Sequence, residues 1–78
     1  MNKNELQNAL NQEGISPDSY DLEGGLLPER YTLAEESAMW SVYYSERGLQ
    51  TGKKTFTSES EACEYFLNTV RDDPTTRA

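Results

Sequence analysis

The clearest structural signal in this chain is an amphipathic segment near its C-terminal end. Its apolar residues recur at three- and four-residue spacing, as one face of an α-helix requires: Ala62, Cys63, Phe66, Leu67 and Val70, with Tyr65 at the edge of the stripe. Ser58 and Glu61 match the capping-box pattern at the start of this segment, and Asp73 followed by Pro74 marks its end. We therefore expect a helix over residues 59–71 that packs its apolar face into a core.

Two segments before this helix alternate in the period-two manner of β-strands. In residues 30–35 the alternation places Tyr31 and Leu33 on one face. In residues 40–45 it places Trp40, Val42 and Tyr44 on a face interpreted as core, whereas Tyr43 points the other way. An exposed tyrosine beside charged residues is typical of protein interfaces, so Tyr43 is the strand residue expected to contact a partner.

A third strand is expected over residues 49–57, joined to the second by a tight turn. Gly48 follows Glu46 and Arg47 and supplies the positive φ that such a turn often needs. Gly52 interrupts the strand and predicts a bulge or bend.

The N-terminal part is expected to hold a short helix, one further turn and a loop. Leu6 and Leu10 share a helix face over residues 4–12, and Gly14 supplies a stop. Residues 16–20 read as a capped turn with proline at its first helical position, and residues 21–28 read as a loop.

These elements predict one small α+β domain over residues 1–78: a short N-terminal helix, a three-stranded antiparallel meander, and a C-terminal amphipathic helix packed on the sheet. Chains of this length bury only about 60% of their unfolded surface, so the core is modest. The eight aromatic residues (one Trp, five Tyr and two Phe) offset a hydrophobic fraction of 35%. Residues 1–3 are expected to be loose, and residues 74–78 to form a frayed tail.

The charge balance favours binding over catalysis. Fourteen acidic residues face seven basic ones, no histidine is present, and the net charge is −7. The acids concentrate in two segments, residues 13–36 and 58–73, around a mildly basic middle. The simplest interpretation is a self-repelling, well-solvated surface; the sharper one is an acidic patch over residues 18–36 for a basic partner.

Other chemistry has weaker support in the sequence. Asp18, Asp21 and Glu23 do not have the spacing of a calcium loop. Cys63 lies on the expected buried stripe with no histidine to activate it, so an inert core thiol is expected. We therefore expect no metal, no cofactor and no catalytic residue. We also expect no nucleic-acid partner, because the net charge opposes phosphate binding. The single cysteine and the lack of a signal sequence or a long apolar run favour a cytoplasmic protein that does not enter a membrane.

Four stretches carry a family resemblance: Tyr20-Asp-Leu-Glu-Gly-Gly, Glu29-Arg-Tyr-Thr-Leu, Trp40-Ser-Val-Tyr-Tyr-Ser-Glu-Arg-Gly48 and Phe56-x-Ser-Glu-x-Glu-Ala-Cys-Glu-Tyr65. Over about residues 15–78 the chain resembles small acidic immunity proteins of bacterial polymorphic-toxin systems, which are found beside Rhs-type or contact-dependent toxins. The resemblance implies a cytosolic antitoxin that binds the toxic domain encoded next to it and blocks its active site. It defines no set of binding residues.

The expected function is therefore an immunity protein, not an enzyme, that occludes a nuclease or ADP-ribosyltransferase toxin with a basic cleft in a one-to-one complex. The alternative is an acidic interaction module, such as a nucleic-acid mimic that regulates a basic protein. From charge and exposure, the residues expected to contact the partner are Asp18, Tyr20, Asp21, Glu23, Glu29, Tyr31, Glu35, Glu36, Tyr43 and Glu46. Tyr43, with Tyr20 or Tyr31, is the expected anchor.

Overall fold

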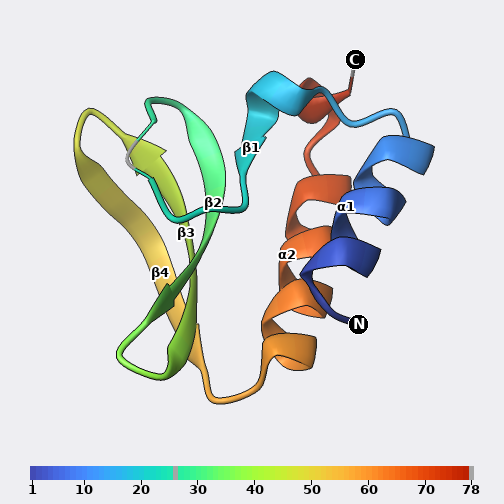
Figure 1. Cartoon of the computed structure of the whole chain (residues 1–78). Helices are drawn as coiled ribbons and strands as arrows, with labels where there is room; N and C mark the ends of the chain where they lie inside the picture. The colour runs from blue at the N-terminus through green and yellow to red at the C-terminus, as the bar shows by residue number, and fades with distance from the viewer. Residues whose placement is uncertain (26, 78) are drawn as a thin grey trace.

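Two helices cover one face of a four-stranded sheet in the computed structural model, which describes residues 1–25 and 27–77 (Figure 1). The expected loop and tail also include residues 26 and 78, which lie outside the described residues. The elements follow one another as α1 (Lys3–Gln12), η1 (Pro17–Ser19), β1 (Tyr20–Asp21), β2 (Arg30–Glu36), β3 (Met39–Glu46), β4 (Leu49–Phe56), α2 (Glu59–Arg71) and η2 (Pro74–Thr76). The predicted α+β class is confirmed, with both helices on the same side of the sheet. None of the described helices is long and apolar enough to cross a membrane.

The sheet is mixed, in contrast to the antiparallel meander expected from the sequence. Its order is β1-β2-β3-β4, and β2, β3 and β4 form the expected antiparallel meander. The additional strand, β1, pairs in parallel with β2, so that Tyr20 lies opposite Tyr31 and Asp21 opposite Thr32. Two residues are too few for an alternation pattern, and only the tertiary pairing makes them a strand.

Helix α1 has well-formed signals at both ends. The side chain of Asn2 accepts a hydrogen bond from the Glu5 amide, and the Glu5 carboxylate accepts one from the Asn2 amide. This reciprocal capping box was not predicted. At the other end Gly14 has φ of 70°, and the Ile15 amide donates to the Leu10 carbonyl, which forms a Schellman ending. The predicted stop at Gly14 is confirmed.

Helix α2 has the predicted bounds. The Ser58 hydroxyl accepts a hydrogen bond from the Glu61 amide, which is the serine half of the expected capping box. Its buried residues are those of the predicted stripe: Ala62, Cys63, Phe66, Leu67 and Val70.

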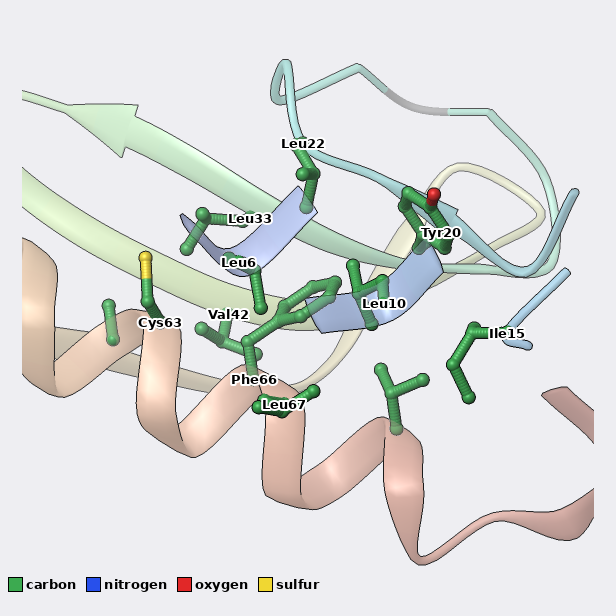
Figure 2. Close-up of a cluster of buried hydrophobic side chains, with 12 residues drawn as sticks. Leu6, Leu10, Ile15, Tyr20, Leu22, Leu33, Val42, Cys63, Phe66 and Leu67 are labelled. Atoms are coloured by element: carbon green, nitrogen blue, oxygen red, sulfur yellow. The ribbon is translucent and has the colours of Figure 1, made fainter. Parts of the chain in front are cut away.

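The core lies between the two helices and the sheet. In Figure 2, Phe66 points from α2 into the space beside Leu10 and Val42, and each of these three side chains is at most 2% exposed. Cys63 is fully buried in the same cluster, and burial raises the pKa of its thiol. Its position supports the expectation of a core thiol that stays protonated.

Both hairpins turn through two residues of positive φ. Arg47 and Gly48 have φ of 52° and 80° between β3 and β4, which confirms the tight connection. Between β2 and β3 the central residues are Ser37 and Ala38, with φ of 50° and 64°. The pairing of β3 with β4 shifts register between Val42 and Tyr44, opposite Gly52, which confirms the expected bulge.

The sheet face away from the helices is covered by the connection between β1 and β2. A Cβ atom on Gly24 would meet the Ala34 side chain at 3.0 Å, and the Tyr43 hydroxyl donates to the Gly25 carbonyl at 3.4 Å. Several strand side chains on this face are buried as a result: Thr32, Ala34, Ser41, Tyr43 and Ser45. The expected exposure of Tyr43 is therefore wrong, because its side chain is only 2% exposed.

Described residues near both ends of the chain contact other elements. The Met1 ammonium donates to the Ser60 hydroxyl at 2.8 Å. Thr76 is buried, its hydroxyl donates to the Val70 carbonyl, and its own carbonyl accepts from the Ser16 amide at 2.7 Å. Pro74 starts a short 3-10 helix, η2, that places Thr76 against the end of α2. Amino-acid composition alone does not predict this contact.

Candidate protein-binding surface

An open groove lies on the helix-covered side of the sheet, between the strands and α2. Its volume is about 280 Å³, and we name it the tyrosine groove after its lining residues: Tyr31, Val42, Tyr43, Tyr44, Thr51, Gly52, Tyr65 and Thr69. Strand register brings Tyr31, Tyr44 and Thr51 side by side across β2, β3 and β4. Pockets for drug-sized ligands occupy roughly 300–1,000 Å³, so this groove suits a single side chain.

Two of the tyrosines form one wall. The rings of Tyr31 and Tyr44 meet edge to face, with centroids 5.0 Å apart and an interplanar angle of 68°. The Tyr31 hydroxyl donates to the Asp73 carboxylate at 2.8 Å. Burial, together with this bond to an anion, raises the pKa of Tyr31 to about 12. Tyr31 therefore remains a neutral donor that holds the ring in place.

The opposite wall comes from α2. The Thr69 hydroxyl donates to the Tyr65 carbonyl at 2.8 Å, one helical turn earlier. The Tyr65 ring packs against Phe56 with centroids 5.3 Å apart, and the Lys54 ammonium lies 5.4 Å from the Tyr65 centroid. The faces of this ring are thus used for apolar and cationic contact.

Three carboxylates give the Tyr44 end of the groove a negative potential. The pKa of Tyr44 is raised, first by burial and then by the charges of Glu29, Glu46 and Asp73. Glu46 lies two residues after Tyr44 on β3, so both side chains lie on the same face of the strand. Glu29 and Glu46 are exposed.

The acidic patch predicted over residues 18–36 is divided between the two ends of the sheet. Glu29 lies at the start of β2, whereas Glu35 and Glu36 lie at its end. Six residue steps along a strand separate the two groups by about 20 Å. As expected for neighbours in a strand, Glu35 and Glu36 point to opposite faces, and Glu36 lies 3.2 Å from the Lys53 ammonium. A hydrogen bond from Ser41 and the bond to Lys53 lower the pKa of Glu36.

Three further acids of the predicted patch have structural partners. Asp18 lies 3.8 Å from Arg30, and Glu23 lies 3.3 Å from Lys3. The two carboxylate oxygens of Asp21 accept from the Glu23 and Gly25 amides and so cap the loop. Each of these acids has a different partner, so the three carboxylates do not form a single binding site.

Of the three expected tyrosine anchors, Tyr31 and Tyr43 line the groove, but the Tyr43 side chain is only 2% exposed. Tyr20 is 7% exposed within the core, where its hydroxyl accepts a hydrogen bond from the Gln7 side-chain Nε2 at 2.6 Å. The Tyr43 hydroxyl is bound by the β1–β2 connection, so neither Tyr20 nor Tyr43 presents an exposed ring to a partner. Sequence analysis missed Tyr44 and Tyr65 as site residues, although the position of Tyr65 at the edge of the apolar stripe is a signal of partial exposure.

Comparison of the chain with protein-family models, with curated proteins and with solved structures finds no match. Its function therefore has to be inferred from its own residues.

Proposed function

We propose that this chain is an immunity protein that binds the toxic domain of a neighbouring bacterial toxin and occludes its active site. The observation that carries the proposal is the placement of the negative charge. All fourteen acidic residues are at least partly exposed, and the described residues form five ion pairs, one of which uses the N-terminal ammonium. A large negative surplus thus remains available on the surface to a basic partner.

Hydrogen bonds keep several of the carboxyl groups in their charged form. The pKa values of Glu13, Glu36 and Asp73 are all lowered by hydrogen bonds, from Arg71, Ser41 and Thr75 respectively. A carboxyl group that acts as a general acid near neutral pH needs the opposite shift. This supports a binding role over an acid–base catalyst.

The mechanism that we propose is electrostatic capture followed by occlusion. Toxins that cleave RNA or transfer ADP-ribose need cationic clefts for phosphate groups, and a small acidic domain in the cytoplasm fills such a cleft. Opposite fields speed the encounter and fix the orientation of the complex. The acids at the Glu29–Glu46 end of the sheet, beside the tyrosine groove, form the contact surface in this proposal.

A second candidate is an acidic module that mimics nucleic acid and regulates a basic cellular protein. The observation that favours it is the separation of Glu29 from Glu35 and Glu36 along β2, because nucleic acid also presents charges spaced along a length.

The test is binding and protection with the toxin domain encoded immediately upstream. We expect a stable one-to-one complex by size-exclusion chromatography with light scattering, and survival of cells that express both proteins. Association should slow at least about tenfold between low and physiological salt, because screening removes the steering. Failure to bind and protect overturns the proposal, and capture of a polymerase or nucleoid protein instead supports the second candidate.

A further inference from the structure

We infer that the tyrosine groove binds an arginine side chain of the basic protein partner, held against the ring of Tyr44 and the carboxylates of Glu29 and Glu46. This inference rests on the proposed function and specifies the contact through which the partner is recognised.

The shape of the groove suits a long, flat side chain. Tyrosines from the sheet and from α2 line it, and Val42 in the lining offers apolar contact for the methylene stem of an arginine. Gly52 belongs to the lining on β4, and a Cβ atom at this position would meet nothing within 4 Å, so this side stays open.

The charge around the groove selects a cation. Asp73 already accepts hydrogen bonds from Tyr31 and Thr75 and acts on the groove through its charge alone. Glu29 and Glu46 form no ion pair with another described residue, so their carboxylates are available to a guanidinium. An anion at this place would face all three charges.

The chain itself uses this chemistry once. The Lys54 ammonium lies over the Tyr65 ring. Lys54 pairs with Val42, and Tyr44 lies two residues further along β3. A second cation fits at the Tyr44 end, where the carboxylates are. Arginine suits this end better than lysine because its planar guanidinium stacks on a ring and binds a carboxylate with two parallel hydrogen bonds.

The first test uses small probes on the full chain. N-acetyl-arginine methylamide is titrated into the ¹⁵N-labelled protein, with the citrulline analogue as an uncharged probe of the same shape. We expect amide shifts centred on Tyr44, Thr51 and Tyr65, and affinity at least about fivefold lower for citrulline. Equal affinity for the two probes, or shifts centred elsewhere, overturns the inference.

Matched variants separate the groove from the general acidity of the surface. Glu29→Gln with Glu46→Gln should weaken arginine binding about fivefold. Glu61→Gln with Glu64→Gln removes the same charge from exposed positions on α2 and should leave binding unchanged. Equal weakening by both pairs indicates nonspecific attraction and overturns the inference.

Tyr44 variants test the ring. Tyr44→Leu should abolish the shifts, and Tyr44→Phe should retain them because the aromatic face is kept. Both are checked for folding by far-ultraviolet circular dichroism, and the Phe variant keeps the test valid if the Leu variant is unfolded. Loss of binding in a folded Tyr44→Phe variant overturns the inference.

These experiments also distinguish the inference from the proposed function. A chain that binds the arginine probe in the groove but not the upstream toxin domain overturns the proposed function alone. A toxin complex whose stability is unaffected by Tyr44→Leu and by the Glu29 and Glu46 substitutions overturns the inference alone.

Discussion

Tyr43 and Tyr44 are neighbours on β3, and the pleat of the strand sends their side chains to opposite faces of the sheet. Tyr43 lies under the β1–β2 connection and donates to the Gly25 carbonyl, so it serves the fold. Tyr44 lines the tyrosine groove beside Tyr31. At the scale of single residues, access to solvent is decided by whether another segment covers the face on which a side chain lies.

Asp73 gives a prediction about pH at the residue scale. Hydrogen bonds from Thr75 and then from Tyr31 hold its pKa below the ordinary value of 3.8. Its charged form therefore stabilises the fold above that value, and the contribution is lost as the pH falls through the folded-state pKa. In urea unfolding, Asp73→Asn should be less stable than the parent at pH 6, and the difference should shrink at pH 3.

Asp72→Asn provides the matched control, because Asp72 is the preceding residue and is exposed. Its stability should stay close to that of the parent at both pH values. A stability difference for Asp73→Asn that is equal at pH 6 and pH 3 would contradict the assignment of the lowered pKa to this carboxylate.

The β2–β3 and β3–β4 hairpin turns both have two residues of positive φ, but their sequences differ. Turns with two positive φ values favour Asn-Gly, since residues with a Cβ atom incur a steric cost there. The β3–β4 turn has Gly48 at its second position, whereas the β2–β3 turn uses Ser37 and Ala38. The first hairpin therefore carries strain that tertiary packing offsets.

Replacement of Ser37 by Asn together with Ala38 by Gly should raise the free energy of unfolding by about 1 kcal/mol, because both new residues tolerate the left-handed conformation. Urea unfolding monitored by Trp40 fluorescence measures the change. Gly48→Ala, in the β3–β4 turn, should lower the free energy of unfolding by about 1 kcal/mol. A loss of stability in the Asn-Gly variant would show that this turn is not strained.

Elements with a strong local pattern were predictable, and elements defined by distant contacts were not. The stripe of α2 and the alternation of β2 and β3 are local, and their bounds agree with the sequence to within about one residue or two, the usual uncertainty of helix and strand ends. The pairing of β1 depends on Tyr31 and Thr32, each eleven residues after its partner in the chain. The docking of Thr76 depends on Ser16, at the other end of the chain.

The whole molecule carries −7 on a body of 32 × 29 × 18 Å, so many of its like charges lie within two or three screening lengths of one another. Added salt should therefore stabilise it at pH 7, because repulsion among surplus carboxylates outweighs the exposed ion pairs. Between about 0.02 and 0.2 M salt, we expect Tm to rise by about 2–4 °C, on the order of 0.5 kcal/mol.

The control is the same salt series near the sequence pI of about 4.4, where net repulsion is small and the rise should disappear. Differential scanning calorimetry measures both series. A fall in Tm with salt at pH 7 would show that the ion pairs dominate, and the electrostatic part of the proposed capture mechanism would lose its basis.

The sequence by itself determined the α+β class, the helix–meander–helix order and the acidity of the surface, because residue spacing and charge are local properties. Only the tertiary structure decided which side chains are accessible. The β1–β2 connection buried Tyr43, the core took Tyr20, and the length of β2 divided the expected acidic patch. The tyrosine groove formed from residues of four separate elements, since strand register and helix placement set contacts between residues far apart in the chain.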